Sequence, residues 1–563
     1  MIHTLLHLFW LLPVLANQSA DPAHTRAEEI LRGMSLEQKV GQLMMVGFGG
    51  RTMGPEISRL LLDHHIGSVA LYSRNISNTE QLAKLVRGIR KTMRDEIQPF
   101  VAIDQEGGNV IRVRADVTVL PGAMALGATR DPVLAYLAGQ ANAVDLGLLG
   151  IDMNLAPVLD VNRNPANPVI NIRAFGDHPK LVANIGTWFI QGQQQAGMAS
   201  VAKHFPGHGD TAHDSHFSLP VTNESLDQLR GTALLPFREA IDAGLDAVMT
   251  AHVRVPAVDD SDTPASLSKK VITDLLRGEM AYDGLVITDD LEMRAIAEKM
   301  SAGEAAVKAI LAGADVIMVI WTPRKKHQVF DALVAAVKDG RISQSRIDTS
   351  VLRILKLKAR RGTLDALSGK ASPLSDSIPN PYHSRLVRTI AHRSITLVRN
   401  QQSILPLCQS RGVLVAGPQK VFLNEMKNLL PDATIVQLSR VPTRKRRQED
   451  LERLTKLAGK HRVVVVAVVN AYQAWLVQRL SHKINVPLVA VSFGSPYYLR
   501  NFPRVAGYLC AYSYLASAQK AAARALCSRI SITGRLPVTI TKHYPRGTGV
   551  TLPRGACSTA ASR

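Results

Sequence analysis

The sequence contains few aromatic residues and few cysteines, and it lacks the motifs of several common classes of protein. Aromatic side chains make up 5% of its 563 residues, and no nucleic-acid-binding motif is recognised. The excess of lysine and arginine gives a net charge of +21, which indicates a general attraction to anions and not the reading of bases. We expect no nucleic-acid partner and keep an anionic cell-wall polymer as a candidate partner.

The four cysteines, Cys408, Cys510, Cys527 and Cys557, all lie in the last third of the chain. None of them forms a CxxC pair, which argues against a zinc knuckle. Four thiols allow three disulfide pairings, and free buried cysteines are an equally open alternative.

Long hydrophobic runs are also absent. The apolar stretch Leu5–Ala16 is too short to span a bilayer, and Val14 to Ala16 offer small residues for cleavage. We therefore predict a signal peptide over residues 1–16 and an exported protein, periplasmic, extracellular or in the cell wall, although no lysine or arginine precedes the stretch. No later segment reaches membrane-spanning length, so we expect no stable membrane span.

The chain is long enough for two domains, and its 46% of hydrophobic residues is typical of a globular protein. Between residues 25 and 365, apolar runs alternate with amphipathic stretches of helical period, which is typical of βα units around a parallel sheet. We predict an α/β fold in which these residues form a (β/α)8 TIM-type barrel, the catalytic domain. The eight expected strands are Leu43–Gly47, Ile66–Leu71, Phe100–Ile103, Ile151–Leu155, Ala199–Ala202, Ala247–Met249, Gly284–Ile287 and Val316–Ile320.

A second unit follows a stretch of Ser, Pro and Asp without periodicity, which we interpret as a linker over residues 366–387. Residues 388–563 then predict a smaller three-layer α/β/α domain. No glycine pattern there completes a phosphate-binding fingerprint, so we assign no nucleotide and expect no cofactor. The expected strands of this domain are Gly412–Ala416, Thr434–Leu438, Val463–Ala467 and Pro487–Val491.

The most informative stretch is Ala202–His216, which crowds four histidines, two aspartates and a lysine together. Pro206 and Gly207 interrupt regular structure, so we predict a loop that follows a buried strand and lies at the catalytic face of the barrel. His204 and His208 stand four residues apart and could suggest a zinc pair. Residues four apart lie on the same face only in a helix, and Pro206 and Gly207 disfavour a helix here. We therefore expect no metal.

Asp214 and His216 are one residue apart, so their side chains point the same way in an extended segment. A carboxylate beside an imidazole raises the pKa of the ring and fixes its orientation, which gives a proton donor useful near neutral pH. Asp289, at the end of the seventh expected strand, is the natural nucleophilic partner. The alternative for Asp289 is a helix cap, because Asp289 and Glu292 have the spacing of a capping box. An imidazole acid/base and a carboxylate nucleophile together suit glycoside hydrolysis with retention.

Several motifs together resemble glycoside hydrolase family 3, and within it the β-N-acetylglucosaminidases (β-hexosaminidases) of peptidoglycan turnover. The resemblance covers the whole expected barrel and, more loosely, the second domain. The motifs are Lys203–Thr211 with Asp214-Ser-His216, Asp104–Gly108, Arg173–Gly176, Met249–His252 and Gly284–Leu291.

The resemblance implies that Asp289 is the nucleophile and that His216 is the acid/base, assisted by Asp214. It also implies that N-acetylglucosamine, at the end of an oligosaccharide or muropeptide, is held by Asp104, Arg112, Arg173, Lys203 and His204. Three residues depart from the family pattern, Asn109, Ala174 and Glu292, and none of them removes a catalytic group. The two-domain build looks like the exported enzymes of the Gram-positive type.

Other functions stay open at this point. A β-glucosidase or β-xylosidase of the same family would use the same nucleophile. Attack by the substrate's own acetamido oxygen, or phosphorolysis, would use much of the same site. A protein of a different class, a non-catalytic wall-binding protein with a decayed barrel, would use only the positive charge.

Overall fold

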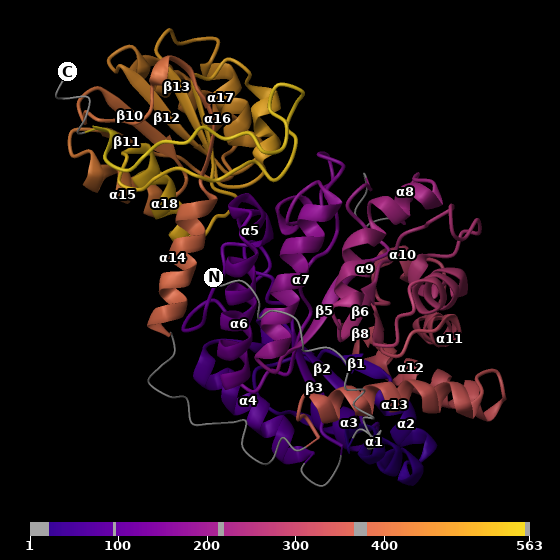
Figure 1. The fold of residues 1–563 in the computed structure, drawn as a ribbon. Helices are drawn as coiled ribbons and strands as arrows, with labels where there is room; N and C mark the ends of the chain where they lie inside the picture. Colours follow the sequence, from indigo (N-terminus) through magenta and orange to yellow (C-terminus); the bar gives the residue numbers. More distant parts are fainter. Residues whose placement is uncertain (1–21, 94–96, 212–218, 365–379, 558–563) are drawn as a thin grey trace, which may run out of the picture.

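The computed structural model describes residues 22–93, 97–211, 219–364 and 380–557. Its larger part is a ring of eight parallel strands surrounded by helices (Figure 1), so the predicted barrel is confirmed. Each of the eight predicted runs overlaps one strand. The strands are β1 (Met44–Val46), β2 (Ser68–Leu71), β3 (Phe100–Ile103), β4 (Met153–Asn154), β5 (Ala199–Phe205), β6 (Ala247–Thr250), β7 (Leu285–Thr288) and β8 (Ile317–Val319). Of these, β5, β6 and β7 extend beyond the ends of their runs.

The ring is closed by hydrogen bonds between its first and last strands. β1 pairs with β2 on one side and with β8 on the other. The amide of Thr288 donates to the carbonyl of Val316, and the amide of Val316 donates to that of Val286, which joins β7 to the start of β8. All eight carboxyl ends therefore open on one face, where barrel enzymes carry their chemistry.

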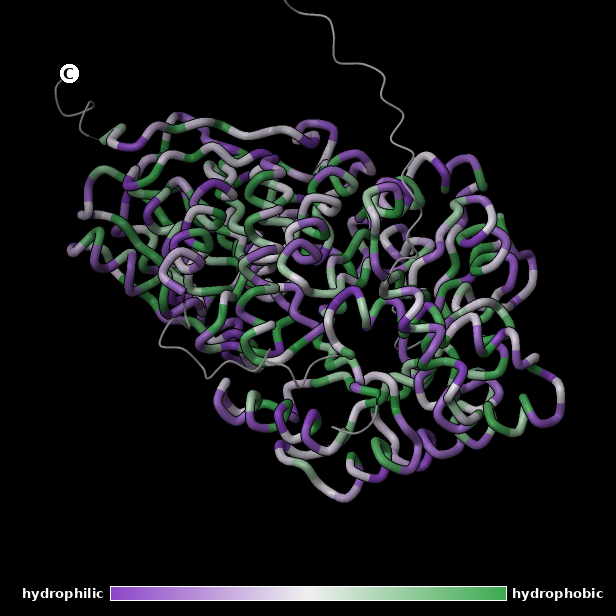
Figure 2. The backbone as a smooth tube through the Cα atoms, turned by 60° about the horizontal axis from the view of Figure 1, so that its bottom comes forward, coloured by the Kyte–Doolittle hydropathy of each residue, from purple (hydrophilic) through white to green (hydrophobic). Residues whose placement is uncertain are grey.

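Helices pack around this ring with one face buried. In α4, Asn78 caps the first turn by accepting from the amide of Gln81, and Leu82, Val86 and Ile89 repeat at helical spacing on the buried side. Figure 2 shows the same alternation of hydrophobic and hydrophilic residues along many helices. The helices of this part are α1 (Pro22–Gly33), α2 (Leu36–Gln42), α3 (Pro55–Leu62), α4 (Thr79–Thr92), α5 (Ala123–Thr129), α6 (Pro132–Leu148), α7 (Pro179–Gln195), α8 (Leu226–Gly231), α9 (Leu234–Asp242), a π-helix (Lys270–Glu279), α10 (Arg294–Ala297), α11 (Ala302–Ala312), α12 (Pro323–Lys338) and α13 (Gln344–Arg360).

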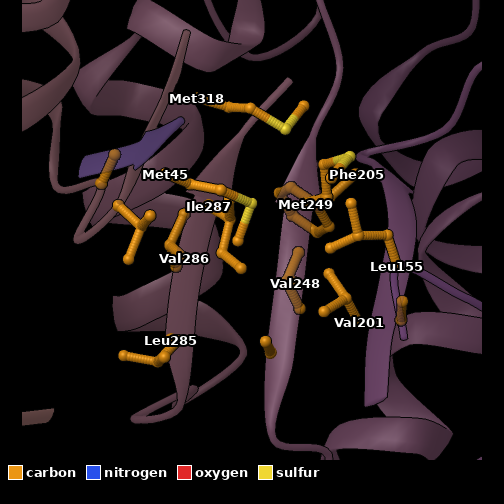
Figure 3. Packing of buried hydrophobic residues seen from close by; sticks show 14 of the residues in the cluster. Met45, Leu155, Val201, Phe205, Val248, Met249, Leu285, Val286, Ile287 and Met318 are labelled. Atoms are coloured by element: carbon orange, nitrogen blue, oxygen red, sulfur yellow. The ribbon is translucent and has the colours of Figure 1, made fainter. Parts of the chain in front are cut away.

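Apolar side chains fill the inside of the barrel beneath the open face. Met249 of β6 is in register with Ile287 of β7, and Met45 of β1 with Met318 of β8. Residues in register point to the same side of a sheet, and these four are buried in one cluster. Figure 3 shows them together with Leu155. The floor of the open face is thus a packed apolar layer.

The second part is a separate α/β domain around a six-stranded sheet in the order β11-β10-β12-β13-β14-β9, which confirms the predicted class. Two strands, β9 and β14, were not predicted, and β9 runs antiparallel to β14 at the sheet edge. The elements are α14 (Pro381–Ser394), β9 (Thr396–Asn400), β10 (Val413–Gly417), α15 (Lys420–Leu429), β11 (Thr434–Gln437), α16 (Arg444–Ala458), β12 (Val463–Val468), α17 (Ala471–Leu480), β13 (Leu488–Ser492), β14 (Gly507–Cys510) and α18 (Ala516–Leu526).

Helix α14 connects the two parts and passes beside α5 and α6 of the barrel (Figure 1). It begins at Pro381, inside the stretch that the sequence suggested as a linker. Polar contacts also join the domains. Asp177 accepts from the amide of Thr539 at 2.6 Å and from Arg546 at 2.8 Å, and the amide group of Asn162 donates to the hydroxyl of Tyr497 at 3.0 Å. The second domain therefore supports the loop that follows β4.

The cysteines divide into one pair and two separate thiols. Cys408 and Cys557 form a disulfide with a Cα–Cα distance of 5.1 Å, which ties the end of the described chain to the segment before β10. Cys510 and Cys527 are free and buried. Among the described helices, none is both long enough and apolar enough to cross a bilayer. The predicted signal peptide, residues 1–16, lies outside the described residues.

Candidate active site

A cavity of about 430 Å³ opens at the carboxyl ends of the barrel strands. Leu155, Met249 and Met318 form its apolar floor, and charged side chains line its walls. All five residues that the sequence assigned to sugar binding lie around it, and so does Asp289. The lining residues are Tyr72, Asp104, Glu106, Val110, Arg112, Leu155, Val169, Arg173, Lys203, His204, His208, Met249, Asp289, Asp290, Met293, Met318 and Trp321.

A buried network of alternating charges makes up one wall. Lys203 Nζ lies 2.7 Å from Asp104 Oδ1 and 2.7 Å from Glu106 Oε1. Arg112 donates to the other oxygen of Asp104 at 3.0 Å. Arg173 holds Glu106 through two parallel hydrogen bonds of 2.9 and 2.8 Å, the bidentate geometry that arginine makes with carboxylates.

The charges in this network stabilise one another. Burial opposes ionisation of Glu106, but Arg173 and Lys203 outweigh it and hold the pKa of that carboxyl well below its usual range. The pKa of Asp104 is lowered because Lys203 and Arg112 overcome the same effect of burial. Burial likewise opposes the charge of Lys203, whose pKa is nevertheless raised by Asp104 and Glu106. Near neutral pH this wall presents fixed charges of both signs, suited to hydroxyl and amide groups of a ligand.

Asp160, in the segment that follows β4, contacts both histidines of the neighbouring wall. His204 Nδ1 lies 2.6 Å from Asp160 Oδ2, and the backbone amide of His208 donates to Asp160 Oδ1 at 2.6 Å. Because the carboxylate binds Nδ1 of His204, Nε2 is the ring atom left to face the cavity. The His208 ring contacts the hydroxyl of Thr211 at 2.7 Å, and burial lowers its pKa.

Asp289 follows β7 directly and is fixed by the backbone. Its amide donates to the carbonyl of Thr250 at 3.0 Å, and its Oδ1 accepts from the amide of Asp290 at 2.8 Å. Burial opposes ionisation, but the nearby rings of His252 and His204 outweigh it, so the pKa of Asp289 is lowered. The carboxylate is thus charged near neutral pH, as a nucleophile must be.

Asp289 does not cap the next helix, which was the alternative role for this residue. The next helix, α10, begins at Arg294 with Met293 as its N-cap, and no side chain caps it. Glu292 instead accepts from the backbone amides of Trp321 and Thr322, which follow β8. This departure from the family pattern therefore fixes the segment that carries Trp321.

Asp290 differs from Asp289 in its surroundings. Burial, with the neighbouring charges of Glu292 and Asp289, raises the pKa of Asp290 to about 7. His252 lies beneath the pair, with Nδ1 at 2.7 Å from the hydroxyl of Ser266 and Nε2 at 3.0 Å from the carbonyl of Asp290. Two adjacent aspartates thus titrate in different pH ranges, and only Asp289 is fully ionised near pH 7.

The stretch predicted as a loop is a strand at its beginning. β5 continues through Phe205, so Lys203 and His204 project from a strand and the loop starts only at Pro206. Gly209 allows the loop to pass against the chain, because a Cβ there would lie 2.0 Å from the carbonyl oxygen of Val161. Asp214 and His216, the predicted acid/base pair, lie outside the described residues.

Sequence reasoning had not assigned Glu106, His208, Tyr72, Asp290 or Trp321 to the site. A signal was available for Glu106, since it follows Asp104 by two residues and extended backbone places such side chains on one side. Trp321 follows β8, and the Arg74 guanidinium lies 4.2 Å from its ring centroid. Its position at the rim depends on Glu292, a contact that no local pattern reveals.

Nothing in the described part of the chain forms a group of three or more His, Cys, Asp or Glu side chains suited to a metal ion. His204 and His208, the pair with zinc-like spacing, have ring centroids 6.2 Å apart and are turned edge to face. Each ring has a partner of its own, Asp160 for one and Thr211 for the other.

Comparison with known proteins gives a consistent result. Residues 35–357 match the family model described as the glycosyl hydrolase family 3 N terminal domain. A β-hexosaminidase A from Pseudoalteromonas piscicida is 33% identical over 446 residues, which cover 72% of this chain and 74% of that protein. A β-N-acetylglucosaminidase/β-glucosidase from Cellulomonas fimi is 29% identical over 548 residues, 90% of this chain and 94% of that one.

Solved structures agree in fold over both domains. A glycoside hydrolase family 3 β-N-acetylglucosaminidase from Paenibacillus sp. str. FPU-7 has a TM-score of 0.85 and 40% identity, covering 90% of this chain and 99% of that chain. A β-glucoside phosphorylase has a TM-score of 0.78 and 25% identity, covering 92% and 96%.

Proposed function

Because the chain belongs to glycoside hydrolase family 3, we propose that it is a retaining, exo-acting β-N-acetylglucosaminidase that removes terminal N-acetylglucosamine from peptidoglycan fragments. The observation that carries this proposal is the position of Asp289, which directly follows β7 and lines a sugar-sized cavity with charged walls, where nearby histidines lower its pKa. The relatives named β-hexosaminidase and β-N-acetylglucosaminidase support the choice of sugar.

In the first step, a carboxylate oxygen of Asp289 attacks the anomeric carbon, and the bond from that carbon to the aglycone oxygen breaks. His216, oriented by Asp214, gives its proton to the departing oxygen. In the second step, His216 takes a proton from water, the water oxygen attacks the anomeric carbon, and Asp289 is released. The sugar leaves with its original configuration.

The charged wall of the cavity would hold the sugar ring during both steps. Asp104, Arg112, Arg173 and Lys203 offer donors and acceptors in fixed positions, and Nε2 of His204 faces the same space. Such preorganised groups bind hydroxyls without reordering at the moment of reaction. Glu106 fixes Arg173 and Lys203, so it acts as a positioning residue.

The nucleophile is tested with Asp289→Ala and a matched control. Turnover of an aryl N-acetylglucosaminide should fall to background in Asp289→Ala and stay unchanged in Asp227→Ala, whose side chain is 92% exposed on α8. A 2-fluoro sugar should label Asp289, and mass spectrometry would locate the adduct. Failure to label during normal turnover would favour attack by the substrate's acetamido oxygen.

The acid/base is tested with two leaving groups. His216→Ala should slow a disaccharide, which needs a proton on its leaving oxygen, at least ~100-fold more than an activated aryl glycoside, which needs little. Equal losses on both substrates would contradict the proposed role of His216.

A β-glucosidase activity is the second candidate, because the similar protein from Cellulomonas fimi carries both activities in its name. Turnover of aryl N-acetylglucosaminide and aryl glucoside under the same conditions separates the two. A product assay in phosphate buffer distinguishes hydrolysis from phosphorolysis.

We also propose that the protein is exported to the periplasm, cell surface or cell wall. The support is the disulfide between Cys408 and Cys557, since such bonds persist in oxidising compartments, together with the apolar N-terminal stretch. Fractionation of cells that express the full chain tests this, and recovery of the enzyme from the cytosol alone would contradict it.

A further inference from the structure

The net positive charge of this protein comes from its second domain. Residues 388–563 contain twenty-seven lysines and arginines, against five acidic residues. The whole chain has a net charge of +21, so the barrel part is close to neutral. The acidic residues of the second domain are Glu425, Asp432, Glu449, Asp450 and Glu452.

Part of this charge gathers around a surface concavity of about 660 Å³, here called the arginine basin. Helix α14 contributes two of its residues, the end of α18 and the segment after it contribute five, and one comes from the last part of the described chain. The residues of the basin are His392, Arg393, Arg524, Arg529, Ile530, Ser531, Thr533 and Arg554.

Two of the four guanidinium groups are already paired. Arg393 contacts Asp131 of the barrel at 2.7 Å, and Arg524 contacts Glu425 at 2.7 Å. Arg529 and Arg554 are exposed, and neither makes an ion pair with an acidic residue in the described part of the chain. The basin therefore holds two uncompensated cations beside two compensated ones.

The backbone that carries these two arginines is held in place. The amide of Arg529 donates to the carbonyl of Arg524 at 2.8 Å, and the amide of Arg554 donates to the hydroxyl of Ser531 at 3.1 Å. Three residues beyond Arg554, the disulfide from Cys557 anchors the chain. The positions of the cations are thus set before any ligand arrives, which lowers the entropic cost of binding.

We propose that the arginine basin binds a phosphate group of a polyanionic polymer and so holds the enzyme on that polymer. Guanidinium groups bind phosphate oxygens through paired hydrogen bonds, and the hydroxyls of Ser531 and Thr533 supply further donors. Burial together with Arg524 lowers the pKa of His392, so the anionic ligand finds its charge on the arginines.

The lining argues against nucleic acid as the polymer. Its described residues include no Phe, Tyr or Trp on which a base could stack. A polymer with repeated phosphates, by contrast, could engage the basin and then the general positive field of the domain. Binding of this kind raises the local concentration of enzyme near substrates attached to the same polymer. The inference rests on the second domain and not on the proposed catalytic residues.

The test measures binding of labelled long-chain polyphosphate to the full chain by fluorescence anisotropy at several salt concentrations. The double variant Arg529→Gln/Arg554→Gln should weaken binding at least tenfold and reduce the salt dependence, because two phosphate contacts are lost. The control Arg444→Gln/Lys445→Gln removes the same charge from exposed positions on α16, and its affinity should change less than threefold.

Equal losses in the two double variants would show diffuse attraction only and would overturn the proposal. Inorganic phosphate at millimolar concentration should compete with polyphosphate for binding to the wild-type protein. It should not reduce the remaining polyphosphate binding of the basin variant. Preference for vesicles containing phosphatidylglycerol over polyphosphate would assign the basin to a membrane and would also overturn it. Turnover of an aryl glycoside should be unchanged in both variants. The binding assay does not depend on catalysis, so it would still test the basin if the wild-type protein did not hydrolyse the glycoside.

Discussion

Replacing Asp290 by asparagine is expected to change how the stability of the barrel depends on pH. Asp290 lines the cavity, and burial raises its pKa to about 7 from the ordinary value of 3.8. Its Oδ1 accepts from the amide of Glu292 at 3.1 Å. Asparagine has the shape of the neutral acid and keeps this acceptor oxygen, but it takes up no proton.

The sign follows from the raised pKa. Between about pH 4 and pH 7, the folded protein holds a proton on Asp290 that the unfolded chain has released, so the wild-type protein loses stability as the pH rises. One pKa unit corresponds to about 1.4 kcal/mol. The shift of Asp290 therefore costs at most about 4 kcal/mol, none of it at pH 3 and all of it above about pH 8.

Thermal unfolding of wild type and Asp290→Asn between pH 5 and pH 8.5 measures this effect. The melting temperature of the variant, relative to wild type, should rise by several degrees across the range, at roughly 2 °C per kcal/mol. The exposed control Asp227→Asn should show no such trend. A difference in melting temperature between Asp290→Asn and wild type that stayed constant across the whole pH range would refute this reasoning. It would mean that Asp290 is ionised in the folded protein.

Three further predictions concern the site and the second domain. Lys203→Met leaves the buried carboxylates of Asp104 and Glu106 without their shared cation, so denaturation should show a loss of roughly 3–5 kcal/mol and kinetics a large fall in kcat/KM; wild-type values would contradict the network. Trp321→Ala should raise KM about tenfold for disaccharides but little for aryl glycosides, because the proposed function places the leaving sugar against the exposed ring at the rim of the cavity; equal changes in KM for both substrates would contradict this placement. Cys557→Ser opens a disulfide that spans 149 residues and should destabilise the second domain by ~2–4 kcal/mol in calorimetry, and an unchanged melting temperature would show that the bond is dispensable.

The barrel could be predicted because its strands are buried on both faces. Such strands appear in a sequence as continuous apolar runs, and each of the eight runs between Leu43 and Ile320 overlaps a strand. Strand β9 escaped prediction because it lies at the antiparallel edge and ends in the half-buried Arg399 and Asn400. Edge strands need fewer apolar residues, so their patterns are weaker.

The candidate site was predictable where its residues follow strands directly. Asp104 and Asp289 come immediately after β3 and β7, and the barrel geometry brings such positions together. Glu106 was missed as a partner of Lys203 and Arg173, although it stands in the same motif as Asp104. Burial and the pairing of charges decide its role, and neither is visible in a sequence read one element at a time.

The arginine basin could not be predicted from the sequence either, because its arginines come together only in the fold. Arg393, Arg524 and Arg554 are isolated in the sequence, so a search for runs of basic residues finds only Arg324–Lys326 and Arg444–Arg447. Folding of the second domain brings the isolated arginines around one concavity, and the contact of α14 with α18 supplies two sides of it. The net charge of a chain therefore indicates attraction to anions, whereas the position of an anion site depends on which cations the fold leaves without acidic partners.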